Sequence, residues 1–149
     1  MAIEVKDLSQ LKLMRKAGLV VADTLKLLKQ SAQIGMTTSE LDEIAAKNLA
    51  KHGATSSFLG YHGFPAVICA SVNEEVVHGI PNKRKLVSGD ILSIDFGAIV
   101  DGWHGDAAIS FGLGEIEEAN QKLMDVCQES MWRGIAAGKK GAKLTDISA

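Results

Sequence analysis

Two aspartates lie in a segment that otherwise predicts an apolar β-hairpin. Residues 93–110 read SIDFGAIVDGWHGDAAIS, with Asp95 in the first apolar run and Asp106 in the second. An ionised carboxylate in such a strand is costly to desolvate unless a partner compensates its charge. The type and spacing of these two residues therefore raise the question of what that partner is.

The dipeptide Asp101-Gly102 predicts a two-residue type I′ turn, which fixes the register of the hairpin. With the turn there, Gly97 faces Asp106 and Asp95 faces Ala108, so both aspartates project from the same side as diagonal neighbours. Diagonal neighbours lie roughly 7–8 Å apart at the backbone, close enough for two side chains to converge on one object. The other face of the first strand is apolar and suits packing on helices. It carries Leu92, Ile94, Phe96, Ala98 and Val100.

Two carboxylates this close repel each other unless they share a proton or bind a cation. Oxygen ligands suit hard or borderline divalent ions, and a pair of metal ions bridged by carboxylate and water is a recurrent hydrolytic device. Two other interpretations stay open from the hairpin alone. The face could be solvated, with the aspartates as ordinary surface residues, or the two carboxyl groups could share a proton as an acid–base pair.

Three helices are predicted around the strands. Apolar residues recur at helical spacing from Leu8 to about Ala32, including Leu11 and Met14. Thr37 and Glu40 form a capping-box sequence for a second helix, which ends at Gly53. A third helix is predicted from about residue 115 to residue 138.

The segment between the second helix and the hairpin predicts a loop followed by strands. The loop is ATSSFLGYHGFP, the strand-like runs are AVICASV and Val76-Val77, and a turn separates them at Asn73-Glu74. His78 follows the second run directly. By itself, a histidine before Gly-Ile-Pro is typical of a partly exposed loop.

The composition is that of one globular domain, with 149 residues, 46% hydrophobic and 23% charged. A net charge of −2 gives no electrostatic case for nucleic-acid binding. Two cysteines make no disulfide framework, and the first ten residues lack a signal-peptide pattern. No window reaches the roughly 18 uninterrupted apolar residues of a membrane span. We therefore expect a cytoplasmic protein that binds neither membranes nor nucleic acids.

The sequence around the aspartates resembles the N-terminal half of a type I methionine aminopeptidase. The runs FLGYHGFPAVICASVNEEVVHGIP and SGDILSIDFGAIVDGWHGDAAISF carry the resemblance, which extends over essentially the whole chain. It implies an α+β pita-bread fold, in which two pseudo-symmetric halves surround a curved antiparallel sheet with helices on its convex face. Residues 1–149 would be the N-terminal part of one such catalytic domain.

The resemblance implies the removal of initiator methionine from nascent polypeptides by hydrolysis of the first peptide bond. The family uses two divalent ions (cobalt, manganese, iron or zinc), and Asp95 and Asp106 match the first two of its five protein ligands. His78 matches the histidine that contacts the substrate near the scissile bond, and it is the predicted catalytic residue. The other residues expected to bind the substrate are Phe58, Tyr61, His62, Phe64 and Cys69.

The resemblance also predicts an incomplete site. The family's second half supplies a histidine and two glutamates as further ligands and another catalytic histidine, yet no histidine follows His104. Residues 141–149 resemble residues 35–43, as if the third predicted helix opened a second helix–helix–strand unit that breaks off where its second helix begins. We therefore expect two incompletely ligated metal ions and no catalysis by these 149 residues alone. A half pita-bread domain would also expose a sheet edge through which copies could associate.

Two functions of different classes remain open from the sequence. The first is a metalloaminopeptidase that acts on peptides beginning with methionine, with the ribosome as a further candidate partner. The second is a non-catalytic pita-bread module that binds the ribosome or another partner. The two aspartates favour the first, because a module without metal has little reason to keep two close, repelling carboxylates.

Overall fold

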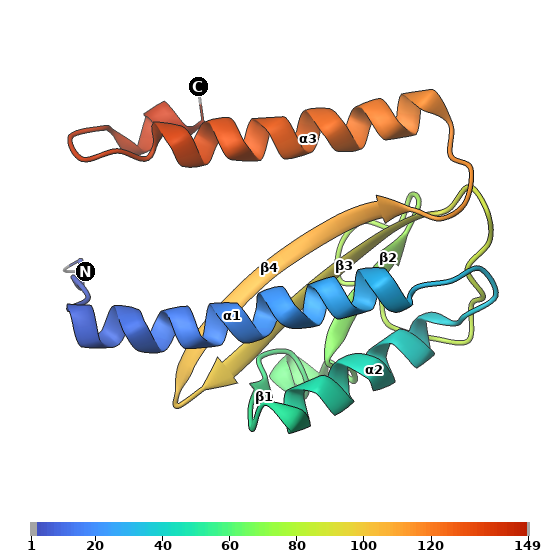
Figure 1. Ribbon diagram of the computed structural model, residues 1–149, viewed down its shortest axis with the longest axis horizontal. Helices are drawn as coiled ribbons and strands as arrows, with labels where there is room; N and C mark the ends of the chain where they lie inside the picture. The colour runs from blue at the N-terminus through green and yellow to red at the C-terminus, as the bar shows by residue number, and fades with distance from the viewer. Residues whose placement is uncertain (1–2, 149) are drawn as a thin grey trace.

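The computed structural model describes residues 3–148, which form helices packed on an antiparallel sheet (Figure 1). The helices are α1 (Leu8–Ser31), α2 (Thr38–Lys51) and α3 (Glu118–Ala137), with short 3₁₀ helices η1 (Tyr61–Gly63) and η2 (Leu144–Ile147). The strands are β1 (Thr55–Ser56), β2 (Ile68–Val72), β3 (Ile91–Val100) and β4 (Trp103–Gly112).

Strand β3 is the centre of the sheet. It pairs antiparallel with β4 on one side and with β1 and β2 on the other. The hairpin turns at Asp101 and Gly102, whose φ values of 51° and 80° are those that a type I′ turn requires. The predicted register is confirmed, because Gly97 lies opposite Asp106 and Asp95 lies opposite Ala108.

The apolar face of β3 forms the core with α1 and α2. Its five predicted residues, 92, 94, 96, 98 and 100, are all buried. Helix α1 lies across β3 and β4, whereas α2 packs beside β1 and β2 (Figure 1). The contact between α1 and β4 is so close that a Cβ at Gly105 would lie 2.7 Å from the carbonyl carbon of Ala17 and the amide nitrogen of Gly18.

Capping residues fix where the first two helices begin. Thr37 Oγ1 accepts from the Glu40 N–H at 3.2 Å, and Glu40 Oε2 accepts from the Thr37 N–H at 2.7 Å, so the predicted capping box is confirmed. Helix α1 has a similar arrangement that was not predicted. The Asp7 carboxylate accepts from the Ser9 and Gln10 N–H groups at 2.8 and 2.9 Å.

Two predictions about the region between α2 and β3 are wrong. Residues 54–65 were expected to be loop throughout, but Thr55 and Ser56 pair with β3. Val76 and Val77 were expected to be strand, but they lie in a loop. Val77 and His78 have φ values of 30° and 51°, which no strand residue adopts.

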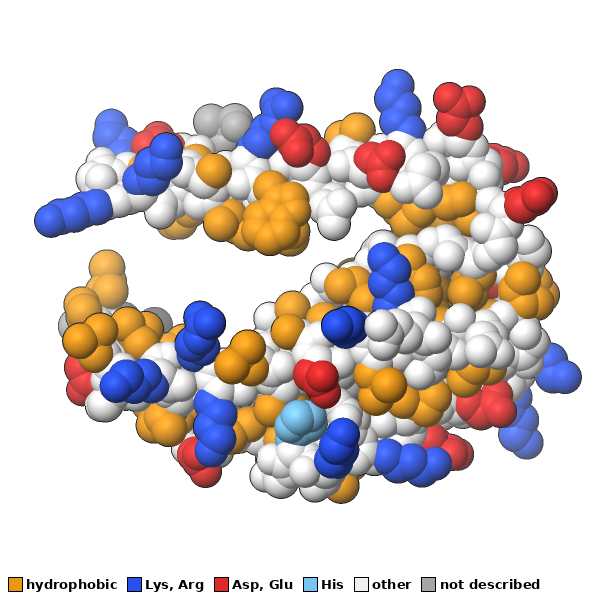
Figure 2. Space-filling model, viewed as in Figure 1, with side chains coloured by type: hydrophobic (Ala, Val, Ile, Leu, Met, Phe, Trp, Pro, Cys, Tyr) orange, Lys and Arg blue, Asp and Glu red, His pale blue; other side chains and the backbone are white. Residues whose placement is uncertain are grey.

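Helices α1 and α3 bury fewer of their apolar side chains than their periodicity predicts. Leu11 and Met14 of α1 are 47% and 37% exposed, and no residue of α3 is buried within the described part of the chain. Hydrophobic side chains gather on the side of α3 that faces α1 across an open space (Figure 2). None of the helices in residues 3–148 combines the length and the hydropathy needed to cross a membrane.

The close approach of α1 to β4 predicts opposite effects for two glycine substitutions. Gly105→Ala should destabilise the fold by about 1–3 kcal/mol, the range of an overpacked core, because backbone atoms of α1 occupy the space of the new Cβ. Gly18→Ala is the matched control, since its Cβ would meet no atom within 4 Å. It should stabilise α1 by about 1 kcal/mol. Urea unfolding followed by circular dichroism measures both, and effects of the same sign would contradict this packing.

Candidate metal and substrate site

A cavity of about 750 Å³ lies on the face of the sheet that carries the two aspartates. The structure brings all the predicted site residues to it from five segments of the chain. The segment after β1 gives Phe58, Tyr61, His62 and Phe64, whereas Cys69 comes from β2, His78 from the loop after β2, Asp95 from β3 and Asp106 from β4.

The floor of the cavity is formed by β2, β3 and β4 side by side. Cys69 lies directly opposite Asp95, and Asp106 lies opposite Gly97, which is two residues after Asp95 and therefore the next residue on the same face of β3. A side chain at residue 97 would collide with the wall, because its Cβ would lie 2.8 Å from Ser57 Cβ and 2.9 Å from Phe58 Cε1. Glycine at this position therefore lets the aromatic wall stand directly beside the carboxylates.

Burial and nearby negative charge both raise pKa values on the floor of the cavity. Burial, and then the charge of Asp106, raise the pKa of the Asp95 carboxyl, while a backbone hydrogen bond from Phe96 and the charge of His78 oppose the rise. Burial and both aspartates raise the pKa of the Cys69 thiol to about 11. At neutral pH this thiol is protonated, so Cys69 acts as a neutral wall residue rather than as a nucleophile.

Carboxylates are suitable ligands for a divalent cation, but two of them are too few to complete its coordination shell. A cation between them would relieve both the repulsion and the burial of charge that raise the Asp95 pKa. Within residues 3–148, however, no group of three or more histidines, cysteines, aspartates and glutamates converges on one point. The described residues thus offer the carboxylate part of a metal site, and a full ligand shell needs further donors.

The wall of the cavity is an aromatic turn around η1. The rings of Phe58 and Phe64 meet edge to face, with centroids 6.4 Å apart, and those of Tyr61 and His62 lie 4.4 Å apart. The Gly60 N–H donates to the Phe64 carbonyl at 2.8 Å and closes the turn. Tyr61 is 68% exposed, so this wall is open towards solvent and accessible to a ligand.

Two polar side chains that were not among the predicted site residues tie the wall to the floor. Ser57 Oγ and His104 Nδ1 lie 3.0 Å apart, and both line the cavity. The Ser57 N–H also donates to the Gly97 carbonyl at 3.1 Å. The hairpin register also predicts His104 on the face of the aspartates, because His104 lies opposite residue 99. The small residue at position 97 was the sequence signal for the other side of this contact, and it does not identify the segment that fills the space.

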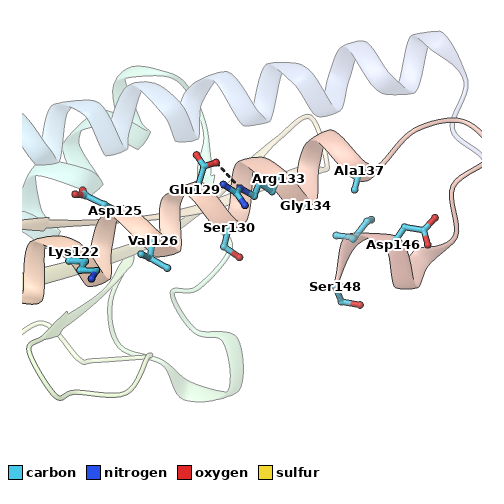
Figure 3. A pocket seen from close by; sticks show the side chains of 11 residues that line it. Lys122, Asp125, Val126, Glu129, Ser130, Arg133, Gly134, Ala137, Asp146 and Ser148 are labelled. Atoms are coloured by element: carbon cyan, nitrogen blue, oxygen red, sulfur yellow. Dashed lines mark hydrogen bonds and ion pairs between the residues drawn. The ribbon is translucent and has the colours of Figure 1, made fainter.

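A second hollow, of about 680 Å³, lies between α3 and η2 (Figure 3). Its lining mixes both signs of charge, including a pair between Glu129 and Arg133 at 2.7 Å on one helix turn. It contains none of the predicted site residues. The sheet cavity is therefore the better candidate for the chemistry of the aspartate pair.

The sequence model of metallopeptidase family M24 matches residues 12–149. The chain is 48% identical over 146 residues to the methionine aminopeptidase of Clostridium perfringens, covering 98% of this chain and 59% of that protein. It is 48% identical over 144 residues to methionine aminopeptidase 1 of Mycobacterium tuberculosis, covering 96% and 54%. The chain thus spans little more than half the length of these curated relatives.

Solved structures agree with the sequence comparison. A methionine aminopeptidase from Rickettsia prowazekii has a TM-score of 0.88 at 34% identity, and one from Thermotoga maritima has 0.86 at 36% identity. Each comparison covers 90% of this chain and 54% of the other. An Xaa-Pro dipeptidase from Bacillus anthracis has a TM-score of 0.78 at 21% identity, a likeness of fold alone. The predicted pita-bread fold is confirmed.

The aspartate pair predicts that removing either charge stabilises the protein when no metal is present. In buffer with a chelator, Asp95→Asn and Asp106→Asn should each raise the free energy of unfolding by up to about 1 kcal/mol, the size of a cross-strand charge interaction. Because either change removes the same repulsion, the double variant should gain less than the two single gains added together. Urea unfolding of the four proteins measures this, and strictly additive gains would show that the two carboxylates do not interact.

Proposed function

Because this chain belongs to metallopeptidase family M24, we propose that residues 1–149 are the N-terminal part of a methionine aminopeptidase domain. The enzyme hydrolyses the first peptide bond of polypeptides that begin with methionine. The observation that carries the proposal is the sheet cavity, in which two carboxylates lie beside an aromatic wall and a histidine. Cytoplasmic nascent chains are the expected substrates, and the ribosome is the expected source of them.

In this proposal Asp95 and Asp106 hold two divalent ions, with cobalt, manganese, iron and zinc as the candidates. When bound, the metal ions supply Lewis-acid activation of a water molecule and of the scissile carbonyl. The carboxylates contribute position and charge. Register fixes them on adjacent strands, and partial burial of Asp95 keeps water from screening its charge.

The aromatic wall and Cys69 are proposed to bind the methionine side chain. A thioether is flexible and polarisable, and it packs well against aromatic rings and sulfur. Phe58, Tyr61 and Phe64 supply the rings, and His62 lies against Tyr61 at the rim. The neutral thiol of Cys69 lines the inner end of this pocket, next to Asp95, without adding charge.

His78 is proposed to contact the substrate near the scissile bond, as a hydrogen-bonding group that lines the same cavity. It lies close enough to Asp95 for its charge to affect that carboxyl group. A histidine there can orient the peptide and move a proton at the reacting atoms.

We further infer that residues 1–149 do not turn over substrate by themselves. The described residues offer two carboxylate ligands, and a dinuclear site needs more donors and a general base. These are expected outside residues 3–148. A non-catalytic binding module is not favoured, because the matched relatives are named as aminopeptidases and the charged pair is retained.

Metal binding should be measurable without catalysis. Added Mn²⁺ or Co²⁺ should raise the midpoint of thermal unfolding of the chain by a few degrees, since a ligand that binds only the folded state stabilises it. Asp106→Ala should abolish this shift. Asp125→Ala is the matched control, because Asp125 lies on α3 and contacts only Gln121 among the described hydrogen bonds. An equal shift in both variants would place the metal elsewhere.

Methionine release from the peptide Met-Ala-Ser tests the function itself. Residues 1–149 with added Mn²⁺ or Co²⁺ should release none, whereas a protein that continues through a second half like that of the relatives should release methionine. In that longer protein Asp106→Ala should abolish release, and His78→Ala should lower kcat by roughly 10²–10⁴-fold. Release by the 149-residue chain that Asp106→Ala abolishes would contradict the inferred inactivity. Release insensitive to that change would contradict the site.

A further inference from the structure

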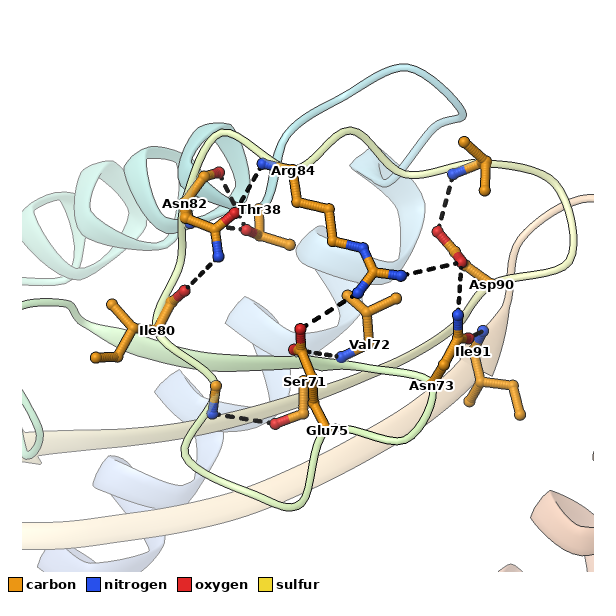
Figure 4. Close-up of polar contacts among 12 residues, drawn as sticks. Thr38, Ser71, Val72, Asn73, Glu75, Ile80, Asn82, Arg84, Asp90 and Ile91 are labelled. Atoms are coloured by element: carbon orange, nitrogen blue, oxygen red, sulfur yellow. Dashed lines mark hydrogen bonds and ion pairs between the residues drawn. The ribbon is translucent and has the colours of Figure 1, made fainter.

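The loop between β2 and β3, residues 73–90, carries His78 into the cavity and is crossed by one arginine. Arg84 Nη1 lies 3.2 Å from Glu75 Oε1, and Arg84 Nη2 lies 3.6 Å from Asp90 Oδ1 (Figure 4). Glu75 precedes His78 by three residues, and Asp90 directly precedes β3. The guanidinium therefore joins the outgoing limb of the loop to its return into the sheet.

We propose that Arg84 is a positioning residue that clasps the two limbs of the 73–90 loop and thereby holds His78 in the cavity. The clasp is defined by Arg84, Glu75 and Asp90. Its importance for substrate rests on the role proposed above for His78, whereas its effect on loop order does not.

The Glu75 end of the clasp is fixed to the end of β2. Glu75 Oε2 accepts from the Val72 N–H at 2.9 Å, and the Glu75 N–H donates to the Val72 carbonyl at 3.2 Å. The other carboxylate oxygen is left to face Arg84. Glu75 thus transmits the position of the arginine to the strand that also bears Cys69.

The Asp90 end is buried and fully engaged. Asp90 is 3% exposed, Oδ1 accepts from Asn73 Nδ2 at 2.9 Å, and Oδ2 accepts from the Val87 N–H at 2.9 Å. Asn73 Oδ1 in turn accepts from the Ile91 N–H at 2.8 Å. A buried carboxylate requires compensation, and Arg84 is the cation beside it. Both ends of the clasp are thus hydrogen-bonded, directly or through Asn73, to residues at the ends of β2 and β3.

The residues between these ends are strained and need such support. Val77 and His78 have positive φ values, and Val is β-branched, for which this region is unfavourable. A residue in this region persists only where its surroundings enforce the conformation.

Backbone contacts hold the loop on the far side of His78. The Gly79 carbonyl accepts from the Ala70 N–H at 2.8 Å, and a Cβ at Gly79 would overlap the Ala70 carbonyl oxygen. Asn82 is bound to Thr38 of α2 and accepts the Arg84 N–H at 2.7 Å. The clasp closes the side of the loop that these contacts leave open.

Amide hydrogen exchange at Glu75 and Gly79 of the purified chain tests the proposal, because their N–H groups donate to the Val72 carbonyl and to Ser71 Oγ. Arg84→Met should speed exchange there at least tenfold while leaving the core amides of α1 and β3 unchanged. Arg84→Lys should restore part of the protection, because an ammonium keeps the charge but does not span both carboxylates as a guanidinium does. Lys83→Met is the matched control in the same basic run, since no ion pair among residues 3–148 involves Lys83. It should leave exchange unchanged.

The imidazole NMR signals supply a second readout that overall stability does not move. The His78 signal should broaden or split in Arg84→Met, with that of His52 unchanged. If Arg84→Met does not fold, the same measurements are made on Glu75→Gln. This change removes the ion pair between Arg84 and Glu75 and leaves that between Arg84 and Asp90 in place.

Unchanged exchange at Glu75 and Gly79 in both Arg84→Met and Glu75→Gln would overturn the proposal, and so would equal acceleration throughout the chain. Loosening of the loop as expected, together with a longer protein that releases no methionine from Met-Ala-Ser, would support the clasp and contradict the proposed function.

Discussion

The repulsion between Asp95 and Asp106 is the constraint on which the rest of the site depends. The turn at Asp101-Gly102 fixes the register of β3 and β4, and the register forces the two carboxylates onto one face of the sheet as neighbours. Burial raises the cost of that arrangement for Asp95. A fold that keeps two such charges together without metal is less stable than it could be, which is typical of a site shaped for a ligand rather than for stability.

Strand β3 brings the other segments of the site to the two aspartates. It contacts β1 and β2 on one side and β4 on the other, so segments that are distant in the sequence reach the carboxylates through one strand. Cys69 arrives opposite Asp95, and Ser57 arrives over Gly97. The other face of β3 packs on α1 and α2, so one strand carries the core on one side and the cavity on the other.

The hairpin was predictable because its signals are local. A turn dipeptide and alternation of period two determine the register and the face of each residue, and both were confirmed. The loop around His78 was not predictable. Valine favours strands, yet Val76 and Val77 lie in a loop whose two limbs are joined by contacts of Arg84 with Glu75 and Asp90. Those contacts join side chains that no local pattern relates.

For the helices, too, the local sequence pattern predicts the element but not its tertiary contacts. Periodicity located α1 and α3 and identified their apolar faces, but it does not say what covers those faces. Val21 and Leu28 of α1 are buried against the sheet, whereas Leu11 is half exposed and α3 buries no residue within residues 3–148. Site residues were predicted through motif resemblance, and Ser57 was missed because it belongs to no such motif.

The two-residue turn also has a consequence for the order in which the site forms. Hairpins close in about 1–10 μs, and contacts between residues near in sequence form before distant ones because they cost less loop-closure entropy. Asp95 and Asp106 meet through such a local contact, whereas Ser57 must reach Gly97 from a distant part of the chain. The charged pair is therefore joined by a contact of low loop-closure entropy, whereas its aromatic wall depends on a contact that costs more.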